Sequence, residues 1–68
     1  MDPHVLHNSA LSRYELFLGE AKIGHADYVD VDGELQFTHT EVDPEHQGKN
    51  YAAILMREAF KDIEENNL

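Results

Sequence analysis

Residues 39–52 read HTEVDPEHQGKNYA, and the change of hydrophobic period across this segment indicates the fold class. Upstream of it, Glu34 to Val42 alternates with a period of two, which is typical of a strand with one buried face. Pro44 ends the alternation, and Gly48 lies in the loop that follows. From about Asn50 the period becomes helical. The sequence therefore predicts a strand, a glycine-containing loop and a helix.

The predicted helix has one apolar stripe with spacings of three and four residues. Its apolar members are Ala52, Leu55, Met56, Ala59, Phe60 and Ile63. Its predicted outer face carries Arg57, Glu58, Lys61, Asp62 and Glu65. The helix is predicted to end at Asn66-Asn67, because asparagine favours helix termini.

Two further strands are predicted upstream, over residues 12–18 and 21–29. In the second strand the apolar residues change from one alternating set, Ala21 and Ile23, to the other, Ala26 and Tyr28. A bulge near Gly24 would place both sets on the same face. Asp32-Gly33 predicts a tight hairpin into the third strand, over residues 34–42. In that third strand, regular alternation places Leu35, Phe37, His39 and Glu41 on one face.

These elements predict an α+β fold, in which a three-stranded antiparallel meander is followed by one amphipathic helix. Residues 1–11 are polar and irregular, and we interpret them as a flexible N-terminal arm before a domain at 12–68. One helix covers only one sheet face, and the third strand is a free edge. An open edge of this kind predicts pairing with another chain, for example in a homodimer.

Composition limits the function classes. The 68 residues carry a net charge of −9, and the five Lys and Arg residues are dispersed, which argues against nucleic-acid binding. The acidic surface suits a cationic substrate or simply keeps the protein soluble. There is no cysteine, which fits a cytoplasmic protein. No secretory signal or apolar stretch of membrane-spanning length is found in the sequence.

The strand–loop–helix junction has the chemistry of an anion site. The first backbone N–H groups of a helix lack intrahelical partners and lie at the positive end of the helix dipole. Gly48 would let a pyrophosphate approach the backbone, and Lys49 adds positive charge. Junctions of this kind are common, so the pattern alone is weak.

The segment Leu35 to Phe60 resembles the central motif of the GNAT (GCN5-related) acetyltransferases, and especially the short stand-alone members. The resemblance rests on the HTEV strand end at 39–42, the loop DPEHQGKN at 43–50 and the amphipathic helix, together with YELFLGEAKIGHADY at 14–28. It implies a GNAT-like N-acetyltransferase that uses acetyl-CoA as co-substrate and acetylates an amine-bearing acceptor.

By match to the family motif, the strand backbone of Glu41 and Val42 would pair with the pantetheine arm. The pyrophosphate would be held by the backbone of Gln47, Gly48, Lys49, Asn50, Tyr51 and Ala52. Two positions depart from the motif, because Glu45 stands where a basic or amide residue is usual and Asn50 where a small residue is usual. Asparagine tolerates unusual backbone angles, so the loop shape can survive.

The family continues into another strand and a final helix, whereas this sequence ends at Leu68. The resemblance thus implies a C-terminally truncated domain, or a naturally short and inactive copy that acts as a CoA-binding or protein-interaction module. A small acidic interaction module with only chance likeness to the family is the third hypothesis.

His39 is the candidate general base for the attacking amine, and Glu41 either orients it or serves as the base. The alternative is a structural His39 that anchors the loop by a hydrogen bond. His39, Glu41, Asp43 and His46 also cluster in sequence, as do His4 and His7. A metal site needs several converging ligands, so we interpret them as ordinary polar residues and predict no metal.

Overall fold

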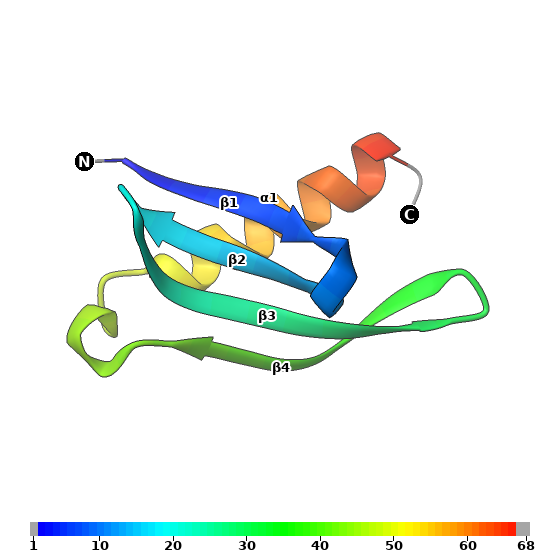
Figure 1. Cartoon of the computed structure of the whole chain (residues 1–68), viewed down its shortest axis with the longest axis horizontal. Coiled ribbons are helices and arrows are strands. Elements are labelled where there is room, and N and C mark those ends of the chain that lie inside the picture. Colours follow the sequence, from blue (N-terminus) through cyan, green and yellow to red (C-terminus); the bar gives the residue numbers. More distant parts are fainter. Residues whose placement is uncertain (1, 67–68) are drawn as a thin grey trace.

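The computed structural model describes residues 2–66 and has one antiparallel sheet with a helix on one face (Figure 1). The strands lie in sequence order, β1-β2-β3-β4. In chain order the elements are β1 (Pro3–Asn8), the 3-10 turn η1 (Ser9–Leu11), β2 (Arg13–Leu18), β3 (Ala21–Val31), β4 (Glu34–Val42), the 3-10 turn η2 (Pro44–His46) and α1 (Tyr51–Asn66).

The sheet has four strands, and the predicted count of three is wrong. The additional strand is β1, which lies in the segment predicted as a flexible arm and pairs with β2 from Pro3↔Leu18 to Asn8↔Arg13. The residue after η1, Ser12, has a left-handed φ of 54° where the chain reverses into β2. Pairing with β2 satisfies backbone groups that an isolated arm would leave to water. Residues 3–8 are therefore part of the sheet.

The core lies between the sheet and α1. Its fully buried side chains include Tyr14 and Leu16 from β2, Ala26 from β3, and Leu55 and Ala59 from α1. Apolar side chains from one face of each strand meet one face of the helix, which is how an α+β layer buries its surface. Within residues 2–66, no second element covers the sheet face opposite α1 (Figure 1).

The predicted bulge near Gly24 is confirmed. Leu16 pairs with Gly24 and Phe17 with Lys22, so Ile23 is the additional residue in β3. Gly24 itself is buried against β4, where an added Cβ would stand 2.8 Å from the backbone oxygen of Glu41. Only glycine fits this close approach of two strands.

A second bulge changes the face assignment of β4. Tyr28 pairs with Phe37 and Asp27 with His39, so Thr38 is the additional residue. An extra residue reverses the alternation beyond it. Phe37 packs on the α1 side against Phe60, with ring centroids 5.4 Å apart. His39 and Glu41 therefore lie on the opposite face, and the prediction that they share a face with Leu35 and Phe37 is wrong.

The predicted helix is confirmed as α1, but its buried face is rotated from the predicted stripe. Leu55 and Ala59 are buried, whereas Ala52 is exposed and Phe60 is 50% exposed. Asp62, predicted on the outer face, bonds to Tyr14 in the sheet. The helix ends at Asn66, and Asn67 and Leu68 lie outside the described residues.

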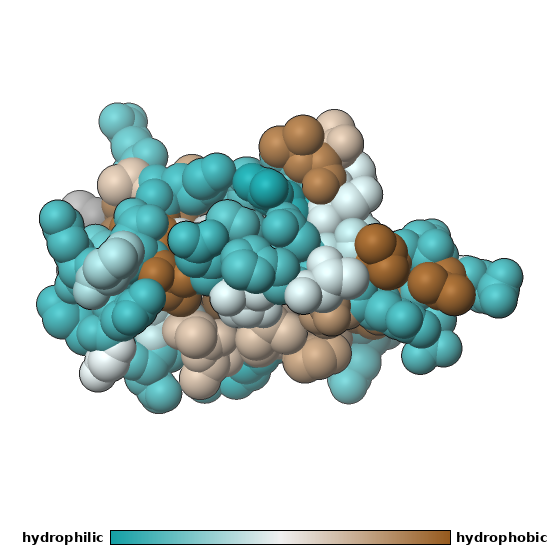
Figure 2. All heavy atoms as spheres, turned by 90° about the horizontal axis from the view of Figure 1, so that it is seen from below, coloured by the Kyte–Doolittle hydropathy of each residue, from teal (hydrophilic) through white to brown (hydrophobic). Residues whose placement is uncertain are grey.

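The β3–β4 hairpin projects beyond the rest of the molecule at the right of Figure 1. Asp32 and Gly33, with φ values of 54° and 84°, form its tip as predicted. Figure 2 views the molecule from the side of β4 and shows a mainly hydrophilic surface with separate small hydrophobic groups. The exposed hydrophobic residues Val29 and Val31 belong to this projecting hairpin.

Candidate functional site

The loop between β4 and α1 is fixed to the end of the sheet. The backbone N–H of Asp43 donates to the carbonyl of Ile23 over 2.7 Å, next to the first bulge. The Gln47 side-chain amide donates to the carbonyl of Val42 over 2.9 Å. Both bonds hold the loop against the last residues of β4, so the helix begins at a defined place beside the strand.

Two residues with positive φ turn the chain from this loop into α1. Gly48 has φ +80° and Asn50 has φ +69°. The carbonyl of Asn50 accepts the N–H of Ile54 over 3.2 Å, which is the first bond of the helical ladder. Asn50 thus adopts the left-handed conformation that asparagine tolerates better than most residues.

A hollow of about 360 Å³ lies where the loop meets the first turn of α1. Its lining residues are Val42, His46, Gln47, Gly48, Asn50, Tyr51, Ala52 and Ala53. The N–H groups of a first helical turn have no intrahelical acceptor, and the helix dipole makes this end positive. The arrangement can therefore accept an anionic group.

Most of the predicted cofactor-binding residues gather around this hollow. Val42, Gln47, Gly48, Asn50, Tyr51 and Ala52 line it, whereas Glu41 and Lys49 do not. Their role in binding stays a prediction. Sequence reasoning missed His46, whose ring meets that of Tyr51 edge-on at 5.9 Å. It also missed Ala53, although a helical first turn at 51–53 places that residue beside the loop.

The two predicted catalytic residues form a pair on the outer face of the sheet, away from α1. His39 Nε2 lies 3.2 Å from Glu41 Oε2, and the side chains are 58% and 60% exposed. This contact fits Glu41 as the group that orients the imidazole. In the described part of the chain, His39 makes no hydrogen bond to the loop, so its predicted alternative role as a loop anchor is not seen.

His25 and Asp27 join this pair from β3, and sequence reasoning missed both. The strand register pairs His25 with Glu41 and Asp27 with His39. The rings of His25 and His39 lie 5.9 Å apart, and His25 Nε2 lies 3.6 Å from Asp27 Oδ2. The missed signal was the i, i+2 spacing of His25 and Asp27 in a predicted strand next to the HTEV strand.

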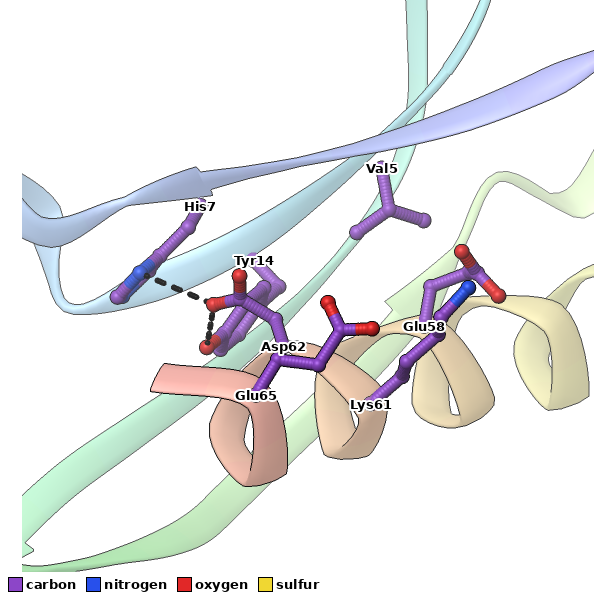
Figure 3. Close-up of a pocket in the computed structure, with 7 residues that line it drawn as sticks. All are labelled: Val5, His7, Tyr14, Glu58, Lys61, Asp62 and Glu65. Atoms are coloured by element: carbon purple, nitrogen blue, oxygen red, sulfur yellow. Dashed lines mark hydrogen bonds and ion pairs between the residues drawn. The ribbon is translucent and has the colours of Figure 1, made fainter. Parts of the chain in front are cut away.

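A second, smaller pocket of about 180 Å³ lies between β1 and the C-terminal half of α1 (Figure 3). Figure 3 shows the Asp62 carboxylate between His7 and Tyr14. Tyr14 donates to Asp62 Oδ2 over 2.7 Å, and His7 Nδ1 lies 3.5 Å from the same oxygen. Burial, and then the bond to Asp62, raise the pKa of Tyr14 well above its usual value. The polar side chains that line this pocket connect the sheet to the helix.

With this geometry in place, a comparison with protein families decides the class of the molecule. The profile described as GCN5-related N-acetyl-transferase matches residues 13–68. The chain belongs to the GCN5-related N-acetyltransferase family. The match begins at β2 and contains the β4–loop–α1 junction and the outer-face pair of His39 and Glu41. The predicted family is therefore confirmed.

Two other comparisons gave no match. Neither a search of curated proteins nor a search of solved structures found a significant relative. Family membership thus rests on the profile and on the antiparallel sheet with its helix, which is consistent with a GNAT-like fold. Among residues 2–66, no helix is long and apolar enough to span a membrane.

Proposed function

We propose that this GCN5-related chain is an acetyl-CoA-dependent N-acetyltransferase, with an acceptor that bears an amine. The observation that carries the proposal is the β4–loop–α1 junction inside the family match, where the hollow is lined by Gly48, Asn50 and the first turn of α1. Loop geometry of this kind presents unpaired N–H groups to a pyrophosphate.

Charge around the hollow supports an anionic ligand in part. Lys49 is exposed beside it and makes no ion pair within residues 2–66, so its ammonium is available. Glu45, in η2, brings one opposing charge. The backbone donors and the helix dipole therefore carry most of the proposed recognition.

The proposed chemistry is direct transfer without a covalent enzyme intermediate. The neutral amine attacks the acetyl carbonyl carbon, the carbon–sulfur bond breaks, and the products are an amide and CoA. His39 or Glu41 accepts the proton that the amine loses, and the CoA thiolate is protonated on release. The 3.2 Å contact between the two side chains would keep the imidazole oriented for that step.

The acceptor is proposed to be cationic in its resting form, such as a polyamine, a lysine side chain or a protein N-terminus. The chain carries 14 acidic and only 5 basic residues, which attract cations.

A second candidate function is a non-catalytic CoA-binding or protein-interaction module, and one observation favours it. Neither His39 nor Glu41 lines the hollow, since both point from the outer face of β4. A chain with this arrangement could bind CoA and yet lack a base at the thioester.

A titration of the ¹⁵N-labelled chain with acetyl-CoA, followed by backbone amide NMR, tests the binding step. We expect saturable shifts at residues 47–53 and at Glu41 and Val42. Pantetheine, which lacks the pyrophosphate, is the matched control and should leave the 47–53 amides unshifted. A well-dispersed spectrum that acetyl-CoA leaves unchanged would contradict the transferase and the CoA-binding module, and would leave the protein-interaction role.

Release of free CoA thiol in the presence of a panel of amines separates the two candidates. Turnover that depends on the amine supports the transferase. Saturable binding without turnover for any amine supports the non-catalytic module.

A further inference from the structure

We propose that His25, His39 and Glu41 form a binding site for a divalent transition metal of the zinc class on the outer face of the sheet. One nitrogen from each histidine and one carboxylate oxygen all lie within 4.8 Å of one another. The three residues come from two neighbouring strands and are not adjacent in the sequence.

Strand register brings these ligands together. Glu41 is the direct partner of His25 across the β3–β4 ladder, and His39 is two residues from Glu41 on the same face. Directly opposed residues and i, i+2 residues are the nearest neighbours on a sheet face. Because both strands belong to a hydrogen-bonded ladder, the three Cα positions are held in place before any ion arrives.

The spacing needs only a small adjustment to become a coordination shell. Ligands about 2.0–2.1 Å from a tetrahedral Zn²⁺ are roughly 3.4 Å from one another. His39 Nε2 and Glu41 Oε2 are already 3.2 Å apart. The side chains of His39 and Glu41 are more than half exposed, so their rotamers are free to move toward His25.

The donor set selects the class of metal. Two imidazoles and one carboxylate suit Zn²⁺, Co²⁺ or Ni²⁺, whereas Ca²⁺ and Mg²⁺ prefer all-oxygen shells. The fourth position would be taken by water, because no fourth residue belongs to the group in residues 2–66. An uncovered sheet face leaves that position open to solvent.

Neighbouring charges on this face are mainly negative. Asp27 Oδ2 lies 3.6 Å from His25 Nε2, and Glu15 is the β2 partner of His25. Arg13 Nε lies 3.0 Å from Asp27 Oδ1, and Lys22 lies 3.5 Å from Glu15, so each of these carboxylates already has a basic partner. Among residues 2–66, Glu41 has only His39 as a basic partner, which leaves it the carboxylate best placed to bind a cation.

Calorimetric titration of the tag-free chain with ZnCl₂, without acetyl-CoA, tests the site. We expect saturable binding of one equivalent. His25→Ala and Glu41→Gln should each weaken binding by at least the roughly 10- to 100-fold that loss of an outer-shell partner costs. His4→Ala is the matched control, because it removes a histidine outside the group and should leave the affinity unchanged.

Amide NMR with paramagnetic Co²⁺ locates the ion, and the same spectra show whether each variant is folded. Line broadening centred on residues 25, 39 and 41 supports the proposal. Broadening centred on His4, His7 or His46, the absence of saturable Zn²⁺ binding, or a folded His25→Ala variant with unchanged affinity would each overturn it.

Discussion

The hydroxyl of Tyr14 donates a hydrogen bond to Asp62 Oδ2 over 2.7 Å and so connects β2 to the C-terminal half of α1. The two residues are 48 positions apart in sequence. Tyr14 is 1% exposed, and the Asp62 side chain is 36% exposed. His7, from β1, lies 3.5 Å from the same carboxylate oxygen. One acidic side chain therefore links the helix to two strands.

Removing this hydroxyl should destabilise the fold. We expect Tyr14→Phe to lower the free energy of unfolding by about 1–2 kcal/mol, toward the low end for a bond to a charged group because Asp62 is partly hydrated. Urea unfolding followed by circular dichroism measures the change. Tyr51→Phe is the control, because no hydrogen bond to the Tyr51 hydroxyl is found within residues 2–66. If both variants lost the same free energy of unfolding, the hydrogen bond between Tyr14 and Asp62 would not be the cause.

Stability should fall in alkaline solution because the pKa of Tyr14 is raised by burial and by the bond to Asp62. Burial also raises the pKa of Tyr28. A group with a raised folded-state pKa stabilises the fold fully below its unfolded pKa, about 10 for tyrosine, and this contribution is lost as pH rises above that value. Urea midpoints measured from pH 8 to 11 should fall above pH 10, and less steeply for Tyr14→Phe. A flat profile would contradict the prediction.

Gly48 and Gly33 offer a matched pair of substitutions. Their φ values are +80° and +84°, and an added Cβ at either position meets nothing within 4 Å. Replacement by alanine should therefore cost each variant a similar amount, about 1–2 kcal/mol, from the left-handed backbone alone. Only Gly48→Ala should weaken acetyl-CoA binding in an NMR titration, since Gly33 lies at the distant hairpin tip. If both variants bound acetyl-CoA equally well, Gly48 would not be part of the acetyl-CoA site.

Gly24→Ala should cost more than either, because the new Cβ would stand 2.8 Å from the backbone oxygen of Glu41. Forced separation of two packed groups costs about 1–3 kcal/mol. The strands would separate where His25 pairs with Glu41, so zinc affinity should also fall. Thermal unfolding and calorimetry measure the two effects. An unchanged melting temperature would show that β4 can move away from Gly24 without a cost in stability.

Zinc should inhibit acetyl transfer if both proposals hold. An ion on His39 Nε2 occupies the lone pair that a general base needs. The rate of CoA release should fall as ZnCl₂ is added and recover with EDTA. In His25→Ala, measured against its own metal-free rate, inhibition should require at least about tenfold more zinc. If the same zinc concentration inhibited both proteins, the inhibiting ion would not be bound at the proposed site.

Much of the fold could be predicted from the sequence, because most elements have a clear period and clear ends. Strands β2, β3 and β4 and the helix lie close to the predicted ranges, and Asp32-Gly33 forms the predicted hairpin tip. Strand β1 was missed for a physical reason. Its side chains toward α1 include His7, which stacks on Tyr14, while the apolar Leu6 is 53% exposed, so the usual alternation of apolar and polar residues is absent.

The candidate site was predictable where it depends on local backbone and not where it depends on strand pairing. Gln47 to Ala52 form a continuous stretch, and most of them gather around the hollow as expected. The environment of His39 depends on a bulge at Thr38 and on the register with β3. The i, i+2 spacing of His25 and Asp27 is visible in the sequence, but the bulge and the register that bring them beside His39 could be assigned only from the sheet.

The bulge at Thr38 also affects how this strand can change in length. Phe37 packs against α1 and His39 faces away from it, because Thr38 between them is an extra residue without a partner in β3. Deleting Thr38 would remove the bulge and leave His39 opposite Asp27, so that His39 and Glu41 would stay on the outer face and Val42 on the inner one. Loss of this one residue should therefore be tolerated, and related sequences that are one residue shorter here should keep His39 and Glu41 on the outer face.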